Sequence, residues 1–341
     1  ITHAAHVLRD APDDAAAMRI IGIQTAEPPK EQAADNVVRL RVVGSDEGFE
    51  GDVERPQTRL ADVAGMAEVK RRLELAFLAP LRNPEMRRMY GKSLRGGLLL
   101  YGPPGCGKTF IARAVAGELG AAFLTIGLPD VLDMYIGQSE KNLHELFENA
   151  RRTAPCVLFI DEIDALGRKR SFMRHSAERN VVNQLLADMD SIGAENEGVF
   201  ILAATNHPWD VDAALRRPGR LDRMLLVLPP DAPAREAILR ANMEGRPSGE
   251  IDYEKLAKQT EGYSGADLVH LCDSAAELAM SDSLSAGTPR KIDMNDFAAA
   301  LKETRASTRS WFETARNYAQ FANDGGMYDD LLAYMRKHKL A

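Results

Sequence analysis

The sequence predicts an α/β fold with a parallel sheet, followed by a smaller all-helical unit. Between residues 60 and 230, short strand-like runs alternate with segments of helical periodicity. After Pro229 and Pro230 the strand-like runs stop, and residues 234–305 have helical periodicity alone. Strands that alternate with helices favour a parallel sheet with helices on both faces, because parallel neighbours need long crossover connections.

Five runs have the length and composition of buried strands, and the segments between them are long enough for crossover helices. These runs are 97–101, 122–125, 156–160, 199–204 and 224–227. Within one crossover segment, 139–152, apolar side chains occur at i, i+3, i+4 and i+7, which gives a helix one buried face. The apolar positions are Leu143, Leu146, Phe147 and Ala150.

The first 57 residues are expected to lie outside the α/β domain. Residues 1–26 are expected to form a helical fragment whose small and apolar positions resemble the end of one tetratricopeptide repeat and the start of the next. A short amphipathic helix is an equally good interpretation. Residues 27–57 are acidic and rich in Pro, Gly and Asp, which is typical of a linker.

The rest of the chain divides near residues 230 and 305. We expect an α/β domain over 58–230, a small helical domain over 231–305 and a helical tail over 306–341. The tail carries apolar and aromatic side chains at helical spacing, and packing is the use that this stripe favours. Its members are Trp311, Ala315, Tyr318 and Ala319.

Composition argues against several classes of protein. The 341 residues are 45% hydrophobic and 27% charged, which is typical of a globular chain. No apolar run approaches the roughly 20 residues that span a bilayer, and the three cysteines lack the paired spacing of zinc ligands. Without a basic and then apolar leader, a cytoplasmic location is expected. The net charge of −7 disfavours nucleic acid as a partner.

A phosphate-binding loop follows the first strand-like run. The pattern G-x-x-x-x-G-K-[ST] lies between a strand and a helical stretch, which is the context it requires. Its glycines let backbone N–H groups turn toward phosphate oxygens, Lys108 reaches the outer phosphates and Thr109 ligates Mg²⁺. A chance glycine turn is the alternative. The expected nucleotide-binding residues are Gly102, Pro103, Pro104, Gly105, Cys106, Gly107, Lys108, Thr109 and Phe110.

Two acids end the strand-like run 156–160. Asp161 is expected to hold Mg²⁺ by way of its waters, and Glu162 to polarise the attacking water. Acids in this position also cap helix N-termini. Combined with the phosphate loop, however, they favour hydrolysis of a nucleoside triphosphate, a reaction that depends mainly on positioning and charge neutralisation.

Polar and basic residues follow the next strand-like run. Asn206 lies where its amide could orient water or the terminal phosphate. Arg216, Arg217 and Arg220 lie on a turn, and such a cluster can be a solvated surface. It can also supply arginine fingers, which raise the rate of phosphoryl transfer by about 10³ to 10⁵ when a neighbour provides them.

From about residue 60 to residue 301, the sequence resembles the ATPase module of the classical AAA family within the AAA+ superfamily. The resemblance includes Leu-Ala-Asp-Val-Ala-Gly at 60–65 and Gly-Tyr-Ser-Gly-Ala-Asp-Leu at 262–268, besides the motifs above. It implies a P-loop NTPase fold, with an AAA+ large domain followed by a helical lid.

The branch within the family is open. Asn-His-Pro-Trp-Asp at 206–210 resembles the vacuolar-sorting and microtubule-severing branch. Residues 216–223 and the tail around 305–319 are more similar to the valosin-containing-protein type. Cys106 and Asn242 depart from common family usage, where Thr and His respectively are frequent.

The resemblance also implies roles for single residues. Asn206 would be the sensor residue, and Arg217 and Arg220 would reach the nucleotide of a neighbouring subunit in a six-membered ring. The adenine pocket would be lined near Asp62, Ala64, Gly265 and Ala266. ATP and Mg²⁺ are the implied cofactors.

A loop with an aromatic residue precedes the helical segment 139–152, where family members carry a pore loop. Tyr135, Ile136 and Gly137 would form it, since a protruding Tyr can grip an extended polypeptide by apolar contact. A Tyr that packs in a turn is the alternative. Residues 168–175 form a second, basic loop that would face the same pore or would simply be a solvated charged run.

These observations predict a hexameric, Mg²⁺-dependent ATPase that pulls on, unfolds or disassembles protein substrates through a central pore. An ATP-switched assembly scaffold, which does not thread substrate, is the alternative. A nucleic-acid translocase is disfavoured by charge.

Overall fold

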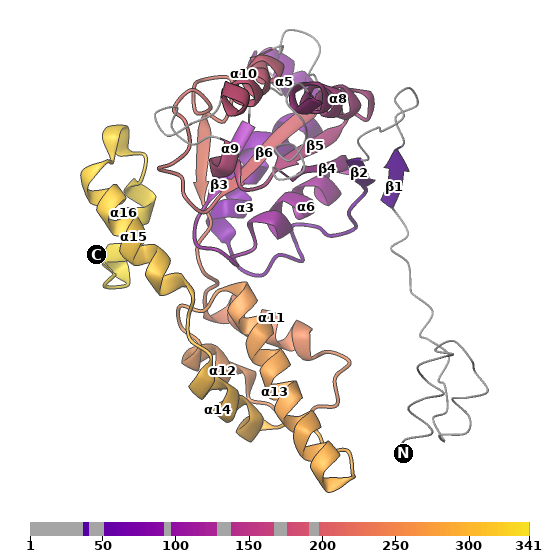
Figure 1. Cartoon of the computed structure of the whole chain (residues 1–341), viewed down its shortest axis with the longest axis vertical. Coiled ribbons are helices and arrows are strands. Elements are labelled where there is room, and N and C mark those ends of the chain that lie inside the picture. Colours follow the sequence, from indigo (N-terminus) through magenta and orange to yellow (C-terminus); the bar gives the residue numbers. More distant parts are fainter. Residues whose placement is uncertain are drawn as a thin grey trace, which may run out of the picture. The chain divides into compact units, whose positions relative to one another are not determined.

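The computed structural model describes residues 37–40, 51–91, 97–127, 138–166, 176–190 and 198–340. Residues 38–341 cluster into one unit, in which a mostly parallel sheet with helices on both faces is followed by a helical lid (Figure 1). This architecture confirms the predicted fold class. The tetratricopeptide-like positions of 1–26 lie outside the described residues.

The sheet has the strand order β1-β2-β4-β5-β6-β3-β7. The pairs β4–β5, β5–β6, β6–β3 and β3–β7 are parallel, and the five strands in them match the five strand-like runs to within one or two residues. The strands span Val37–Leu40 (β1), Gly51–Glu54 (β2), Gly97–Tyr101 (β3), Ala122–Ile126 (β4), Cys156–Ile160 (β5), Val199–Thr205 (β6) and Arg223–Leu226 (β7).

Strand β2 differs from the expectation that residues 27–57 form a linker. It pairs antiparallel with β4, with Val53 opposite Leu124. Val53 is buried in the core, and Glu54 Oε2 accepts a hydrogen bond from Arg113 Nε at 3.2 Å. A single apolar side chain among acids and glycines carries too little hydrophobic pattern to predict a strand, so the pairing depends on the edge that β4 offers.

The two faces of the sheet are covered by different helices, because successive side chains of a buried strand point to opposite faces. On β5, Leu158 and Ile160 pack in one core with α8 (Gln138–Arg152) and α10 (Ser176–Asp190). Val157 and Phe159 pack in the other with α6 (Lys108–Leu119). The strands are therefore apolar on both faces, as β5 is over its full length.

The remaining helices of the large domain are short. The five-residue π-helix η1 (Glu74–Leu78) links α3 to α4. Among the described residues, no helix has the length and hydropathy to cross a bilayer. The others are α3 (Ala67–Leu73), α4 (Ala79–Arg82), α5 (Pro84–Met89) and α9 (Ile163–Leu166).

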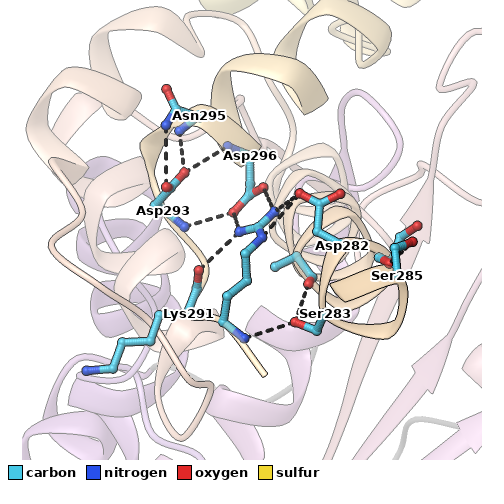
Figure 2. A network of polar contacts seen from close by, with 10 residues as sticks. Asp282, Ser283, Ser285, Lys291, Asp293, Asn295 and Asp296 are labelled. Carbon is cyan, nitrogen blue, oxygen red and sulfur yellow. Dashed lines mark hydrogen bonds and ion pairs between the residues drawn. The ribbon is translucent and has the colours of Figure 1, made fainter. Parts of the chain in front are cut away.

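Helices α11 (Ala232–Met243), α12 (Tyr253–Gln259), α13 (Gly265–Ala286) and α14 (Met294–Glu303) share a core of their own. Helix α13 begins with a capping box between Ser264 and Asp267. Its far end is joined to the start of α14 by Arg290, which lies 2.7 Å from Asp282 and 2.6 Å from Asp296. Figure 2 shows these two carboxylates turned toward one guanidinium group.

The C-terminal tail forms α15 (Thr308–Phe321), a short 3₁₀ turn (Asp324–Gly326) and α16 (Asp329–Lys337). As the stripe of tail residues predicts, its members are used in packing: Trp311, Ala315 and Ala319 are buried. They share a core with Tyr101 of β3 and with Trp209, which follows β6. The tail thus packs against the carboxyl ends of two central strands.

Candidate functional site

The phosphate loop connects β3 to α6 by a close turn. Gly102 has a φ of 152°, and a Cβ at this position would lie 2.0 Å from the Val227 carbonyl oxygen, so no larger side chain fits. Gly105 and Gly107 have φ of 71° and 86°, in the left-handed region that glycine adopts most readily. The loop therefore presents the N-terminus of α6, a 12-residue helix, as an anion-binding end.

Lys108 lies on the first turn of α6 and is buried. Its Nζ donates to the carbonyl oxygens of Gly102 and Pro103, both at 2.9 Å, and to Asn206 Oδ1 at 2.7 Å. Burial lowers the pKa of Lys108 to about 8. The ammonium group is thus held by neutral acceptors at the point where a phosphate would provide negative charge.

Cys106 occupies the loop between the two left-handed glycines. It is 2% exposed, and burial raises the pKa of its thiol to about 12. Since the thiolate is the reactive form, Cys106 acts here as a small packed side chain and not as an oxidation-prone group.

Thr109 and the two acids after β5 meet beside the loop. The Thr109 hydroxyl donates to Asp161 Oδ2 at 3.1 Å, and the Glu162 backbone N–H donates to Asp161 Oδ1 at 2.9 Å. Glu162 is exposed and has a φ of 48°, a left-handed conformation that is uncommon for a residue other than glycine. A hydroxyl and a carboxylate side by side provide the oxygen donors that Mg²⁺ prefers, so the residues present fit this ion.

The end of β6 is fixed by a side-chain pair that the sequence did not single out. The Thr205 hydroxyl donates to Asp164 Oδ1 at 2.6 Å and accepts from the His207 backbone N–H at 2.9 Å. These bonds lie on both sides of Asn206 and hold the turn that carries it. The sequence shows Asp164 as the third acidic residue of the segment 161–164, but its spacing does not indicate a contact with β6.

The residues expected near adenine are only partly brought together. The Ala266 N–H donates to Gly105 O at 3.1 Å, so the start of α13 touches the phosphate loop, next to Gly265. Asp62 is exposed and accepts from the Arg59 backbone N–H at 2.7 Å. Ala64 is partly buried, and Phe110, at the loop's other end, is 45% exposed.

The three arginines before β7 have different surroundings. Arg216 Nη1 lies 2.7 Å from the sulfur of Met327 in the tail. Arg217 is exposed. Arg220 donates to Ala214 O at 2.7 Å and to both carboxylate oxygens of Asp190 at the end of α10, which lowers the pKa of Asp190. This intramolecular partner of Arg220 was not predicted.

The backbone of Arg220 lies at the opposite end of β3 from the phosphate loop. The Gly97 N–H donates to the Arg220 carbonyl at 2.6 Å, which places this turn at the amino end of β3. The phosphate loop leaves the carboxyl end of the same strand at Tyr101. Tyr135, Ile136, Gly137 and the basic segment 168–175 lie outside the described residues.

Comparison with protein families identifies both parts of this arrangement. Residues 98–228 match the model described as "ATPase family associated with various cellular activities (AAA)", and residues 250–298 match the AAA+ lid domain. The chain carries an AAA ATPase domain with its lid. The AAA domain is that of an ATP hydrolase.

Two relatives illustrate the range of proteins that share this domain. A protein named as a cell division cycle ATPase of Plasmodium falciparum (isolate 3D7) is 37% identical over 291 residues, which cover 85% of this chain and 22% of that protein. ATP-dependent zinc metalloprotease FtsH 2 of Symbiobacterium thermophilum is 46% identical over 247 residues, which cover 70% of this chain and 41% of that protein. The chain thus spans less than half the length of each.

Proposed function

We propose that this chain is a Mg²⁺-dependent ATPase that works as a six-membered ring, completes each active site with arginines from a neighbour, and uses ATP turnover to remodel protein substrates. The observation that carries the shared site is that the backbone of Arg220 bonds to Gly97, at the opposite end of β3 from the chain's own phosphate loop. Gly97 and Gly102 are five positions apart, which is about 16 Å along a strand.

Each residue around the phosphate loop has a role in this proposal. Lys108 binds the outer phosphates, and Thr109 and Asp161 hold Mg²⁺, which neutralises phosphate charge when bound. Glu162 polarises the attacking water. Asn206, bonded to Lys108, orients the terminal phosphate or that water.

The arginines complete the site from outside. An arginine side chain is shorter than the span of β3, so Arg220, whose backbone lies at the amino end of that strand, does not reach the subunit's own phosphates. Arg217, which is exposed, is available to a neighbour without rearrangement. Arg220 reaches one only after it leaves Asp190, so we assign it the second contact.

The remodelling of proteins rests on the sequence of the loop around Tyr135, Ile136 and Gly137 and on the relatives. One relative is named as a protease that depends on ATP, and such an enzyme must act on polypeptide. An aromatic residue in a pore would grip a chain without reading its sequence. The scaffold that does not thread substrate remains the second candidate.

Mixed rings test the shared site. Arg217→Ala subunits should hydrolyse ATP poorly because each site then lacks one of the two arginines that a neighbour supplies. Glu162→Gln subunits should hydrolyse it poorly because they lack the water-activating group. A mixture of the two should regain turnover, since the intact acid of the first meets the intact arginine of the second. A mixture no more active than its components would contradict the proposal.

Substrate capture separates the two candidate functions. Proteins that co-purify with Glu162→Gln in ATP should be lost when Tyr135→Ala is added, if a pore holds them. Partners retained by the double variant would support the scaffold. ATP affinity, measured on both variants, should be equal and serves as the control.

A further inference from the structure

A tail helix contacts the backbone of the residue that also contacts Lys108. The indole N–H of Trp311, on α15, donates to the carbonyl oxygen of Asn206 at 2.6 Å. The amide side chain of Asn206 accepts from Lys108 at 2.7 Å. Trp311 is 5% exposed, so its N–H has left water and depends on this carbonyl as a partner.

The turn after Asn206 is held by the same helix through aromatic packing. Trp209 stacks on Tyr318, with ring centroids 4.5 Å apart and 3° between the ring planes. Its ring also lies 6.0 Å from that of Trp311. Trp311 and Tyr318 are seven positions apart, two turns along one face of α15, and this face therefore fixes the residues on the carboxyl side of β6.

The start of α15 is bound to the lid. The Thr308 hydroxyl donates to the Gly262 carbonyl at 2.6 Å, and the backbone N–H and hydroxyl of Ser307 donate to Asp267 Oδ2 at 3.1 and 3.0 Å. Asp267 belongs to the capping box that begins α13, next to Ala266, which bonds to the phosphate loop. One helix thus joins the lid to Asn206.

We propose that Trp311 is a positioning residue for ATP hydrolysis. Trp311 fixes the orientation of Asn206, and through α15 it couples this orientation to the position of the lid. The proposal rests on the proposed function, because it assigns Asn206 a role in turnover. Because the backbone carbonyl of Asn206 is held by the indole N–H, the side-chain amide of the same residue can point in only a narrow range of directions. Loss of the indole bond should therefore reduce the rate of turnover more than ATP affinity.

The test measures ATP turnover and KM of the full chain with Mg²⁺. Trp311→Phe keeps an aromatic ring and removes the donor, and we expect kcat to fall about threefold to tenfold while KM changes by less than about twofold. Leu331→Ala is the matched control, because Leu331 is buried in the same tail core. This variant should lower the midpoint of thermal unfolding without the loss of kcat.

A double-mutant cycle with Asn206→Ala distinguishes positioning from general damage. If Trp311 acts through the Asn206 amide, Trp311→Phe should have no further effect on kcat in the Asn206→Ala background. Equal fold-losses in both backgrounds, or a parental kcat in the folded single variant, would overturn the proposal. Tyr318→Leu, which removes the stack on the partly exposed side of α15, provides a second variant with the same expected non-additivity.

Glu162→Gln separates failure of this inference from failure of the proposed function. If Glu162→Gln abolishes turnover and Trp311→Phe leaves it unchanged, only the role of Trp311 is wrong. If Glu162→Gln turns over ATP at the parental rate, the assignment of the active site itself fails.

Discussion

The Nζ of Lys108 lies 2.7 Å from the Oδ1 of Asn206, although 98 residues separate them in the chain. This bond joins the first turn of α6 to the residue after β6. Together with the bonds to Gly102 and Pro103, it gives the ammonium group three neutral oxygen acceptors. A phosphate that binds there would exchange neutral partners for a charged one, which favours binding.

Nucleotide affinity should depend on pH through Lys108. Its pKa of about 8 means that the free protein loses the ammonium charge above pH 8, and a bound phosphate would restore it. The dissociation constant for MgATP should be constant below pH 7 and rise about tenfold by pH 9. Calorimetry on Glu162→Gln, which should not consume the ligand, measures it.

Proton uptake provides the control for this pH dependence. Binding at pH 8.5 should take up protons, whose number follows from the binding enthalpy in buffers of different ionisation enthalpy. If binding takes up no protons and the affinity does not change with pH, Lys108 has an ordinary pKa and the prediction is wrong.

The two variants Lys108→Ala and Glu162→Gln should fail at different steps. The first removes the charge that meets the outer phosphates, so ATP binding should weaken at least tenfold. The second keeps size and shape at a site beside Asp161, so ATP should bind with near-parental affinity while turnover falls at least a hundredfold. Equilibrium binding and steady-state turnover on the same preparations measure both.

Gly117 should not tolerate alanine, although alanine favours helix by about 1 kcal/mol. A Cβ at this position of α6 would lie 2.1 Å from Thr58 O and 2.8 Å from Pro56 O. The segment that leads to Asp62 and Ala64 must then move away from α6, and we expect a loss of about 1 to 3 kcal/mol in unfolding free energy. Chemical denaturation measures it, and a gain in stability would contradict the contact.

Arg290 should stabilise the lid in a way that depends on pH. Its bonds lower the pKa of Asp296, a buried carboxyl group. Because the pKa of Asp296 is lower in the folded protein, its carboxylate stabilises the fold above the pKa of the unfolded state, about 4. This stabilisation is lost as the pH falls through the pKa of the folded state. Arg290→Met should therefore lower the thermal midpoint by about 3 °C at pH 7, and by less below pH 4.

The control for Arg290 is an ion pair of similar type on the surface. Lys258 and Glu254 are 2.6 Å apart with side chains 70% and 71% exposed. Lys258→Met should change the thermal midpoint little at any pH, because exposed pairs contribute little. Equal effects of the two substitutions would show that burial of Asp296 is unimportant.

The fold was predictable where the pattern is local. Strands β3, β5 and β6 are continuous apolar runs, and each ends at a polar or glycine residue that marks its boundary. Strand β2 was missed because its residues are acidic and its pairing depends on β4, about 70 positions later in the chain. A local pattern contains no information about such an edge.

The positions of the candidate site residues were predictable to a similar extent. The loop over 102–109 and the acids after β5 are adjacent in sequence to the strands that place them, so spacing alone locates them. The bonds of Asn206 to Trp311 and of Arg220 to Asp190 join residues 105 and 30 positions apart. Periodicity shows that Trp311 is buried, but not which carbonyl its N–H meets.

Strand β3 begins where Gly97 bonds to the arginine turn and ends at the phosphate loop. In a ring with shared sites, these two ends would belong to two different active centres. Strand β3 is paired with β6 over its whole length and with β7 over residues 98–101, which makes it stiff along its axis. A nucleotide that displaces the phosphate loop of one subunit would then also displace the arginines that this subunit contributes to the neighbouring active site. The rigidity of these five residues would therefore make the subunits of the ring hydrolyse ATP in sequence.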